Sequence, residues 1–236
     1  MLRHRISNIL NDVTNILLPL SCFGCNARLY RGEVAICTSC RHQLPLTEYT
    51  FNEENAVDRI FYGRINIKKA SSFLFFSDIG IVKNLIHYLK YKNQEGIGAL
   101  MGDWYGQILK DQGDLAHIDF VIPVPLHRKK LKQRGYNQVA LFAQRLAFHI
   151  GSTYLDTVLI KTANSKTQTK KNRLSRWYDN RSLYELTDTQ ILRHTSILLV
   201  DDVITTGATM EICAKTFQEI EGLTVYITSL AVVPKS

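Results

Sequence analysis

The chain has 236 residues, of which 45% are hydrophobic and 21% are charged. This length suits one large domain, or one domain with a small added module, and the apolar content excludes an intrinsically disordered chain. With only 13 glycines and 5 prolines, a collagen-like or low-complexity protein is also excluded. No uncharged apolar run reaches about 18 residues, so we expect no membrane-spanning helix.

The N-terminal residues combine apolar and polar side chains with a helical period. The apolar positions are Ile6, Ile9, Leu10, Val13, Ile16 and Leu17, which predict an amphipathic helix over residues 3–18. Asn8, Asn11 and Asp12 interrupt the apolar stretch, which argues against a secretory signal peptide. We expect this helix to pack on the body of the protein. A helix on a membrane surface is the alternative, which the few cations on its polar face disfavour.

Four of the five cysteines form two CxxC pairs, Cys22 with Cys25 and Cys37 with Cys40, separated by eleven residues. Each pair can hold two thiolates on a tight turn, and two such turns complete a tetrahedral zinc site. Two disulfides are the alternative, but the absence of an export signal favours reduced thiols. We therefore expect a closed structural zinc site, whose loss loosens the N-terminal module rather than the active site. Cys213 is expected to be a small core residue.

Beyond the cysteines, strands and helices are predicted to alternate along the chain. After a linker over 45–59, we expect strands over 70–76, 120–124, 157–161, 196–200 and 224–232, and helices over 79–91, 96–110, 135–150 and 208–221. This alternation favours an α/β domain with a mostly parallel sheet. We expect two domains, an N-terminal helix and zinc module over 1–45 and the α/β domain over 46–236.

The formal net charge of +8 is concentrated in one part of the chain. Residues 119–176 hold twelve Lys and Arg against two acidic residues, which gives +10 there and −2 elsewhere. Such clusters form either a solvated face or a site for a polyanion, which is a phosphorylated metabolite or a nucleic acid. The candidates for nucleic-acid contacts are Lys129, Lys130, Lys132, Lys166, Lys170, Lys171, Arg173, Arg176 and, for base stacking, Trp177. Packing at the start of a helix is the alternative for Trp177.

The most informative segment runs over residues 197–209. Asp201 and Asp202 follow an apolar strand, at the edge where open α/β sheets bind ligands. The next residues, Thr205, Thr206, Gly207, Ala208 and Thr209, open a helix whose N–H groups and hydroxyls can hold a phosphate. The carboxylates can accept hydrogen bonds from a sugar diol or approach Mg²⁺. The pattern favours a ligand with a sugar diol beside a 5′-phosphate; a structural turn capped by Thr and Asp is the alternative.

This segment resembles the 13-residue signature of type I phosphoribosyltransferases, which bind phosphoribosyl pyrophosphate (PRPP) with Mg²⁺. The resemblance implies their fold, a mostly parallel sheet flanked by helices. It also implies that Asp201 and Asp202 hold the ribose hydroxyls and that the turn over 205–209 holds the 5′-phosphate. These enzymes hold the pyrophosphate on a loop after an early strand, for which the candidates are Val124, Pro125, Leu126, Arg128 and Arg134. Two prolines that merely end a strand are the alternative. The segment 162–176 resembles in position their substrate-covering loop.

The order of motifs along residues 5–233 is similar to that of the ComF family, which includes the ComFC and GntX proteins. The two CxxC pairs are followed by Val-Ile-Pro-Val-Pro-Leu at 121–126, Arg-Gly-Tyr-Asn-Gln at 134–138 and the signature. The resemblance implies a cytoplasmic role in natural transformation, at the inner face of the membrane through partners. Incoming single-stranded DNA is handled there beside a helicase-like motor. No motif marks an acceptor pocket, so active transfer, binding and metabolite sensing all remain open, and no catalytic residue is assigned.

Overall fold

The computed structural model describes residues 20–113, 115, 117–162 and 183–234. The helix predicted over 3–18 lies outside the described residues, as does most of the basic segment that follows residue 162.

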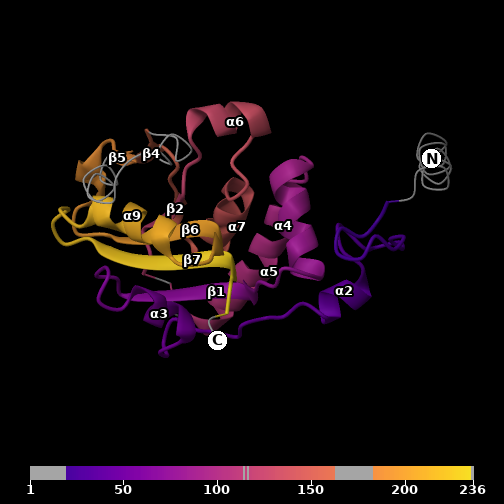
Figure 1. Cartoon of the computed structure of the whole chain (residues 1–236). Coiled ribbons are helices and arrows are strands. Elements are labelled where there is room, and N and C mark those ends of the chain that lie inside the picture. The colour runs from indigo at the N-terminus through magenta and orange to yellow at the C-terminus, as the bar shows by residue number, and fades with distance from the viewer. Residues whose placement is uncertain (1–19, 114, 116, 163–182, 235–236) are drawn as a thin grey trace, which may run out of the picture.

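A five-stranded sheet forms the centre of the molecule (Figure 1). Its strands are β1 (Lys69–Phe75), β7 (Thr224–Val232), β6 (Ser196–Ile204), β2 (Phe120–Pro123) and β3 (Thr153–Tyr154), in that spatial order. Every pairing between these strands is parallel. The predicted α/β class with a mostly parallel sheet is therefore confirmed.

Helices cover both faces of this sheet. One face packs against α4 (Ile81–Tyr91), α5 (Gly96–Gln112) and α7 (Ala140–Ile150). The other face packs against α3 (Ala56–Phe61), α9 (Ala208–Phe217) and a separate antiparallel hairpin of β4 (Leu159–Lys161) and β5 (Tyr184–Leu186). The apolar run of β6 serves both layers, because successive strand residues point to opposite faces. Leu198 and Val200 enter the α4–α5–α7 core, while Ile197 and Leu199 enter the α3–α9 core.

The N-terminal cysteine segment, with α2 (Thr38–His42), continues into the same core. Cys22, Ile36 and Leu44 belong to the cluster of buried side chains that includes α4 and α5. In Figure 1 this segment lies at the end of the molecule beyond α4.

The stretch over 45–59 is not the linker that its polar composition predicts. Phe51 is buried, and the Thr47 N–H donates to the Phe73 carbonyl at 3.0 Å. Asn55 and Asp58 form a capping box at the start of α3. The prediction was wrong because these polar side chains cap α3 and bond to β1. From the local sequence alone, such a polar segment cannot be told from a loop.

The remaining differences concern short elements. The predicted helix over 135–150 begins only at residue 140, and a separate helix α6 (Arg128–Arg134) precedes it. Gly135, with φ of 86°, ends α6. None of the α6 residues is buried, so it has no apolar stripe from which a helix is predicted. The strands β3 and β5 and the 3-10 helix η3 (Thr189–Leu192) also lack a periodic signal, because each has at most four residues.

Candidate functional site

Two adjacent carboxylates lie near the carboxyl end of β6, which runs on to Ile204 instead of ending at residue 200. Asp201 is 8% exposed and Asp202 is 7% exposed. Because side chains alternate along a strand, Asp202 shares the α4–α5–α7 face and Asp201 shares the α3–α9 face. The two carboxylates therefore contact different neighbouring residues.

Asp202 is held by one side chain from α4 and one from the turn before α7. Its Oδ2 accepts a hydrogen bond from Gln138 Nε2 at 2.7 Å and lies 3.1 Å from Lys90 Nζ. Gln138 in turn accepts a hydrogen bond from Arg134 through its Oε1. A buried carboxylate needs such partners, because an unpaired charge loses its hydration without compensation.

Asp201 has a different environment. Burial, followed by the charge of Asp202, raises the pKa of Asp201, although a hydrogen bond from the Asp202 N–H at 2.8 Å opposes the rise. Lys161 of the β4–β5 hairpin contributes an attractive charge and donates to the Tyr184 hydroxyl at 2.7 Å. Burial lowers the pKa of Lys161 and raises that of Cys213, a core residue of α9 as expected. The acid pair thus has a lysine on each side.

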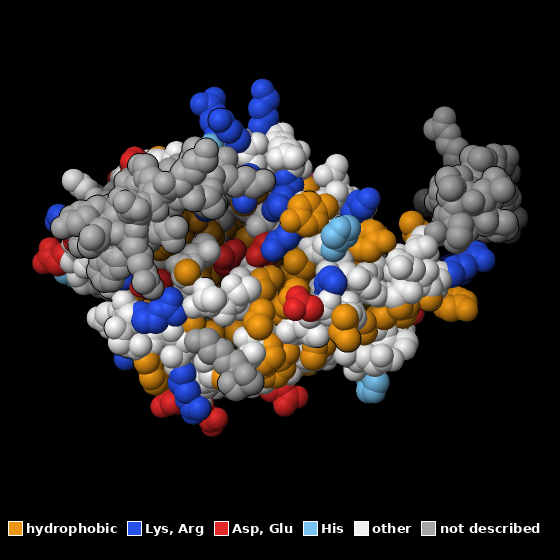
Figure 2. Space-filling model, in the orientation of Figure 1, with side chains coloured by type: hydrophobic (Ala, Val, Ile, Leu, Met, Phe, Trp, Pro, Cys, Tyr) orange, Lys and Arg blue, Asp and Glu red, His pale blue; other side chains and the backbone are white. Residues whose placement is uncertain are grey.

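The turn after β6 forms a small hollow with Asp201, one of the two acids. Its lining is Asp201, Val203, Ile204, Thr205, Thr206, Gly207, Ala208, Thr209 and Met210. Figure 2 shows acidic side chains within a hollow on this face of the molecule, with Lys and Arg side chains along its rim. The backbone N–H groups at the start of α9 and the threonine hydroxyls are the donors that such a turn offers to a phosphate.

Gly207 is required by this turn for two reasons. Its φ of 77° lies in the left-handed region, and a Cβ there would lie 2.6 Å from Ile60 Cγ2. Arg64, from the segment after α3, donates from Nη1 to the Thr206 carbonyl at 2.7 Å and pairs with Glu211 of α9. The turn is therefore fixed from outside by α3 and the residues that follow it.

The loop after β2 runs beside β6. The Val124 N–H donates to the Val200 carbonyl at 2.8 Å, and Asn137 Nδ2 donates to the Val124 carbonyl at 3.0 Å. Val124 is buried and both Pro125 and Leu126 are half-buried. The 134–138 segment therefore contacts this loop through Asn137 and Asp202 through Gln138.

The predicted cations divide between two environments. Arg134 is half-buried, with its guanidinium 5.5 Å from the centre of the Tyr91 ring. Arg128, Lys129, Lys130 and Lys132 are all exposed on α6. His127, for which the sequence suggests no partner, caps this helix by accepting a hydrogen bond from the Lys129 N–H at 3.2 Å. Lys166, Lys170, Lys171, Arg173, Arg176 and Trp177 lie outside the described residues.

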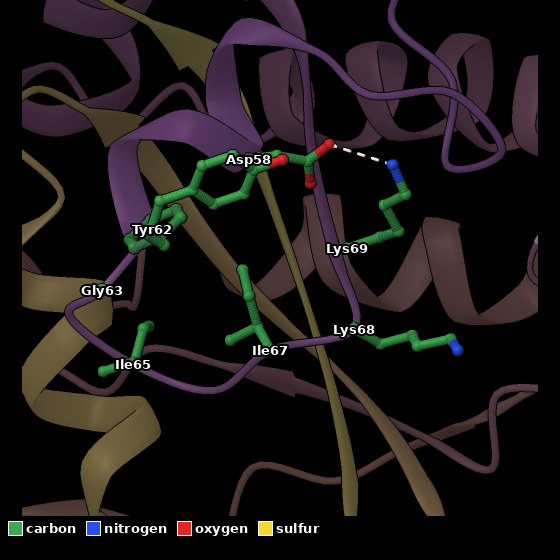
Figure 3. Close-up of a pocket in the computed structure, with 8 residues that line it drawn as sticks. Asp58, Tyr62, Gly63, Ile65, Ile67, Lys68 and Lys69 are labelled. Atoms are coloured by element: carbon green, nitrogen blue, oxygen red, sulfur yellow. Dashed lines mark hydrogen bonds and ion pairs between the residues drawn. The ribbon is translucent and has the colours of Figure 1, made fainter.

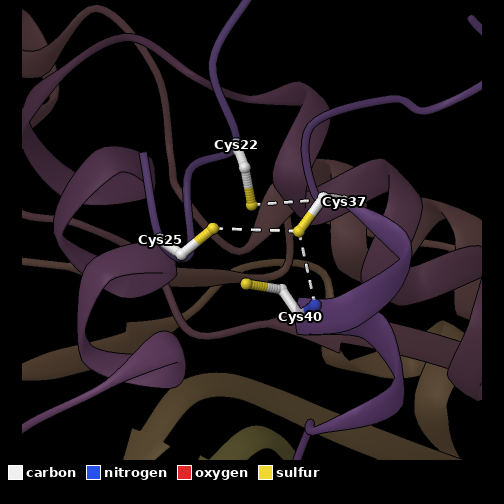
Figure 4. A group of neighbouring side chains, drawn as sticks. All are labelled: Cys22, Cys25, Cys37 and Cys40. Atoms are coloured by element: carbon white, nitrogen blue, oxygen red, sulfur yellow. Dashed lines mark hydrogen bonds between the residues drawn. The ribbon is translucent and has the colours of Figure 1, made fainter. Parts of the chain in front are cut away.

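The four cysteines Cys22, Cys25, Cys37 and Cys40 converge on one point (Figure 4). Their sulfur atoms all lie within 4.8 Å of one another, and none of the four is in a disulfide. Burial raises the pKa of Cys22, but backbone N–H groups, led by that of Cys37, outweigh it and lower the pKa to about 7. Four converging thiols of this kind can hold a metal ion in a closed site, because the thiolate is the ligand form.

The cysteine cluster is joined directly to α4. Asn84 Nδ2 donates to the Gly24 carbonyl at 2.7 Å, and the Tyr88 hydroxyl donates to Asn26 Oδ1 at 3.1 Å. The rings of Phe23 and Tyr88 lie 4.8 Å apart. The helix that carries Lys90 to Asp202 is therefore the same helix against which the cysteine cluster packs.

A second hollow, of about 220 Å³, lies beside the α3–β1 connection (Figure 3). Tyr62, Ile65 and Ile67 line it, with Asp58 and Lys69 paired at 3.2 Å. Asp58 also accepts hydrogen bonds from the Asn55 and Ala70 N–H groups. Its carboxylate is thus used to tie α3 to β1, so this hollow offers no free acid for chemistry.

Sequence reasoning assigns no role to Lys90, Gln138, Tyr184 or Arg64, and it places Lys161 only in a charge cluster. Gln138 stands in the quoted 134–138 motif, and Lys90 stands in a short series of tyrosines and lysines, but neither pattern names a partner. Their contacts join segments far apart in the chain, for which a single sequence carries no local signal.

Within the parts of the chain that the structure describes, no helix has the length and apolar character needed to cross a membrane. The described residues define an α/β protein with a parallel central sheet, an acid pair and a glycine-containing turn at the carboxyl edge of that sheet, and a four-cysteine cluster that packs against α4.

No protein-family model matches the chain. It is 23% identical over 208 residues to "Competence protein F" of Haemophilus influenzae, which covers 84% of this chain and 91% of that protein. It is 25% identical over 203 residues to "Competence protein ComFC" of Bacillus subtilis, covering 84% and 78% respectively. "DNA utilization protein YhgH" of Salmonella typhi is 27% identical over 130 residues, covering 53% and 56%. These relatives support the resemblance of the chain to the ComF family.

One solved structure with a similar fold is the glutamine PRPP amidotransferase of B. subtilis, complexed with ADP and GMP. The TM-score is 0.43 at 18% sequence identity, with 61% of this chain and 30% of that chain covered.

Proposed function

We propose that this chain is a PRPP-binding, phosphoribosyltransferase-like protein of natural competence that acts in the cytoplasm. The observation that carries the proposal is the hollow lined by Asp201 and the turn over 205–209, with the buried carboxylate of Asp202 next to Asp201 in the same strand. Sugar hydroxyls are hydrogen-bonded by carboxylates, and a phosphate is held by N–H groups at the start of a helix.

Each part of PRPP has a proposed partner. Asp201 and Asp202 accept hydrogen bonds from the ribose hydroxyls, and the turn binds the 5′-phosphate. In the loop of Val124, Pro125 and Leu126, the proposed backbone donor to the pyrophosphate is the Leu126 N–H, because the Val124 N–H bonds the Val200 carbonyl and Pro125 has no N–H. Arg134 adds positive charge. Mg²⁺ arriving with PRPP would neutralise part of the pyrophosphate charge.

Calorimetry with Mg²⁺ and PRPP tests this assignment. The double variant Asp201→Asn, Asp202→Asn should lower the affinity by about a hundredfold or more, because two charge-assisted contacts of about 1.5–3 kcal/mol each are weakened. Asp103→Asn is the matched control, because it neutralises another ion-paired carboxylate, which belongs to α5, pairs with Arg145 of α7 and lies outside the 197–209 segment. Unchanged affinity in the double variant would show that the segment is only a structural turn.

An active phosphoribosyltransferase of unknown acceptor is the second candidate, and a metabolite-sensing regulator is the third. The pairing of Lys161 with Tyr184 near Asp201 favours the enzyme, because it places a partly desolvated amine beside the proposed sugar site. Release of pyrophosphate in the presence of bases, amines or DNA separates the candidates. Release that depends on one acceptor supports the enzyme, whereas binding without release supports a binding protein or a sensor.

We further propose that single-stranded DNA is a partner, with a helicase-like competence motor. The support is α6, where Lys129, Lys130 and Lys132 are all exposed on a helix with no buried residue. Binding should weaken with salt, with a log–log slope of about −0.7 per phosphate contacted. Changing these three lysines to Glu should flatten the slope for all sequences alike. Failure of the unaltered protein to bind oligonucleotide at low salt would refute this role.

The metal proposed for the four cysteines is zinc. A closed site with four thiolate ligands is typical of structural zinc, which contributes directly to the free energy of folding.

A further inference from the structure

The last turn of α4 brings a lysine into contact with the acid pair. Lys90 Nζ lies 3.1 Å from Asp202 Oδ2, and the lysine side chain remains 24% exposed. The same carboxylate oxygen accepts the hydrogen bond from Gln138. The ammonium therefore occupies the side of Asp202 that faces α4, at the edge of the proposed ligand site.

The backbone that carries Lys90 is held in place by the 134–138 segment. The Tyr136 hydroxyl donates to the Leu89 carbonyl, and Arg134 lies over the ring of Tyr91. A lysine has a long flexible stem, so its ammonium can move by several ångströms while such a backbone stays fixed. Lys90 can thus change partners without movement of α4.

The place to which the ammonium would move lies beside the neighbouring strand. β2 pairs with β6 through Pro123 and Val200, so the loop beginning at Val124 starts beside the residues that precede Asp202. Adjacent strands are about 4.8 Å apart. A pyrophosphate on this loop would lie within the reach of a lysine that already contacts Asp202.

We propose that Lys90 holds Asp202 in the free protein and transfers its ammonium to the pyrophosphate when Mg²⁺-bound PRPP binds. This inference rests on the proposed function. Asp202 Oδ2 already contacts two donors, Gln138 and Lys90, so a ribose hydroxyl or a metal ion can bind this oxygen only after Lys90 has left it. Releasing Lys90 leaves two adjacent buried carboxylates with less positive charge, which is unfavourable unless the ligand brings its own cation. Lys90 therefore selects Mg²⁺-bound PRPP over a sugar phosphate that lacks the pyrophosphate.

The test compares two ligands by calorimetry, PRPP with Mg²⁺ and ribose 5-phosphate. Lys90→Met should weaken PRPP binding by about ten- to hundredfold, the loss expected for one charge-assisted contact, and leave ribose 5-phosphate binding unchanged or tighter. Lys90→Arg should restore most of the PRPP affinity. Lys92→Met is the matched control, because Lys92 is exposed just beyond the same helix, and should change neither affinity.

Equal weakening of both ligands by Lys90→Met would overturn the inference, because Lys90 would then act only by holding Asp202. Unchanged binding of both would overturn it as well. If Lys90→Met does not fold, Lys90→Gln, which keeps a hydrogen-bond donor without the charge, must meet the same two expectations. An unaltered protein that binds neither ligand would instead refute the proposed function. The two failures are therefore distinguishable.

Discussion

Replacing Gly207 by Ala tests whether close packing of α3 shapes the proposed phosphate turn. The new Cβ would lie 2.6 Å from Ile60 Cγ2 and 2.9 Å from Phe61 Cε1. Both neighbours are buried, at 4% and 1% exposure, so they cannot move aside into solvent. Overpacking of this kind costs about 1–3 kcal/mol. The left-handed backbone adds about 1–2 kcal/mol, so we expect the free energy of unfolding to fall by about 2–5 kcal/mol.

Gly151→Ala separates the two contributions. Gly151 has a φ of 75°, close to the 77° of Gly207, but no heavy atom lies within 4 Å of the position that its Cβ would take. Urea unfolding of both variants should therefore show Gly207→Ala to be the less stable by about 1–3 kcal/mol, which is the steric part alone. The affinity for PRPP should fall only in Gly207→Ala, because only that residue lines the hollow.

Equal unfolding free energies for the two variants would refute the packing argument, since the backbone cost is common to both. An unchanged PRPP affinity in a destabilised Gly207→Ala variant would show that the turn does not contact the ligand.

Two further predictions concern the metal and the acid pair. Elemental analysis should find zinc bound to the four cysteines. Its removal should speed amide exchange in α4 as well as in residues 20–44, because Asn84 and Tyr88 bond the cysteine segment; faster exchange in residues 20–44 alone would support the narrower expectation from sequence. Burial, followed by the charge of Asp202, raises the pKa of Asp201 above the value of about 3.9 that it has in the unfolded chain. The contribution of Asp201 to stability is therefore full below about pH 3.9 and is lost as the pH rises through the folded-state pKa. Asp201→Asn should therefore gain stability relative to the unaltered protein as the pH is raised from about 4 to about 8, and a constant difference in unfolding free energy would contradict the raised pKa.

Local sequence determined several parts of this protein. The strand predicted over 224–232 coincides with β7, because an apolar run of this length has few alternatives to a strand buried on both faces. The four cysteines converge as their two CxxC turns predict, because two cysteines with only two residues between them already share one turn. Asp201 and the threonine turn line one hollow because they are neighbours in the chain as well as in the fold.

Only the tertiary structure determines which side chains contact the acid pair and compensate its charge. Lys90 of α4 and Gln138 of the turn before α7 reach Asp202 from segments far away in sequence, and Lys161 reaches the Asp201 side from a separate hairpin. The polar stretch over 45–59 and the basic helix α6 likewise escape local prediction, since their roles depend on capping bonds and solvent exposure. Hydrophobic periodicity reports which face of an element is buried, but it carries no information about the partner that the face meets. The electrostatics of the site depend on those partners, and so on the packing of α4, the 134–138 segment and the β4–β5 hairpin around one strand.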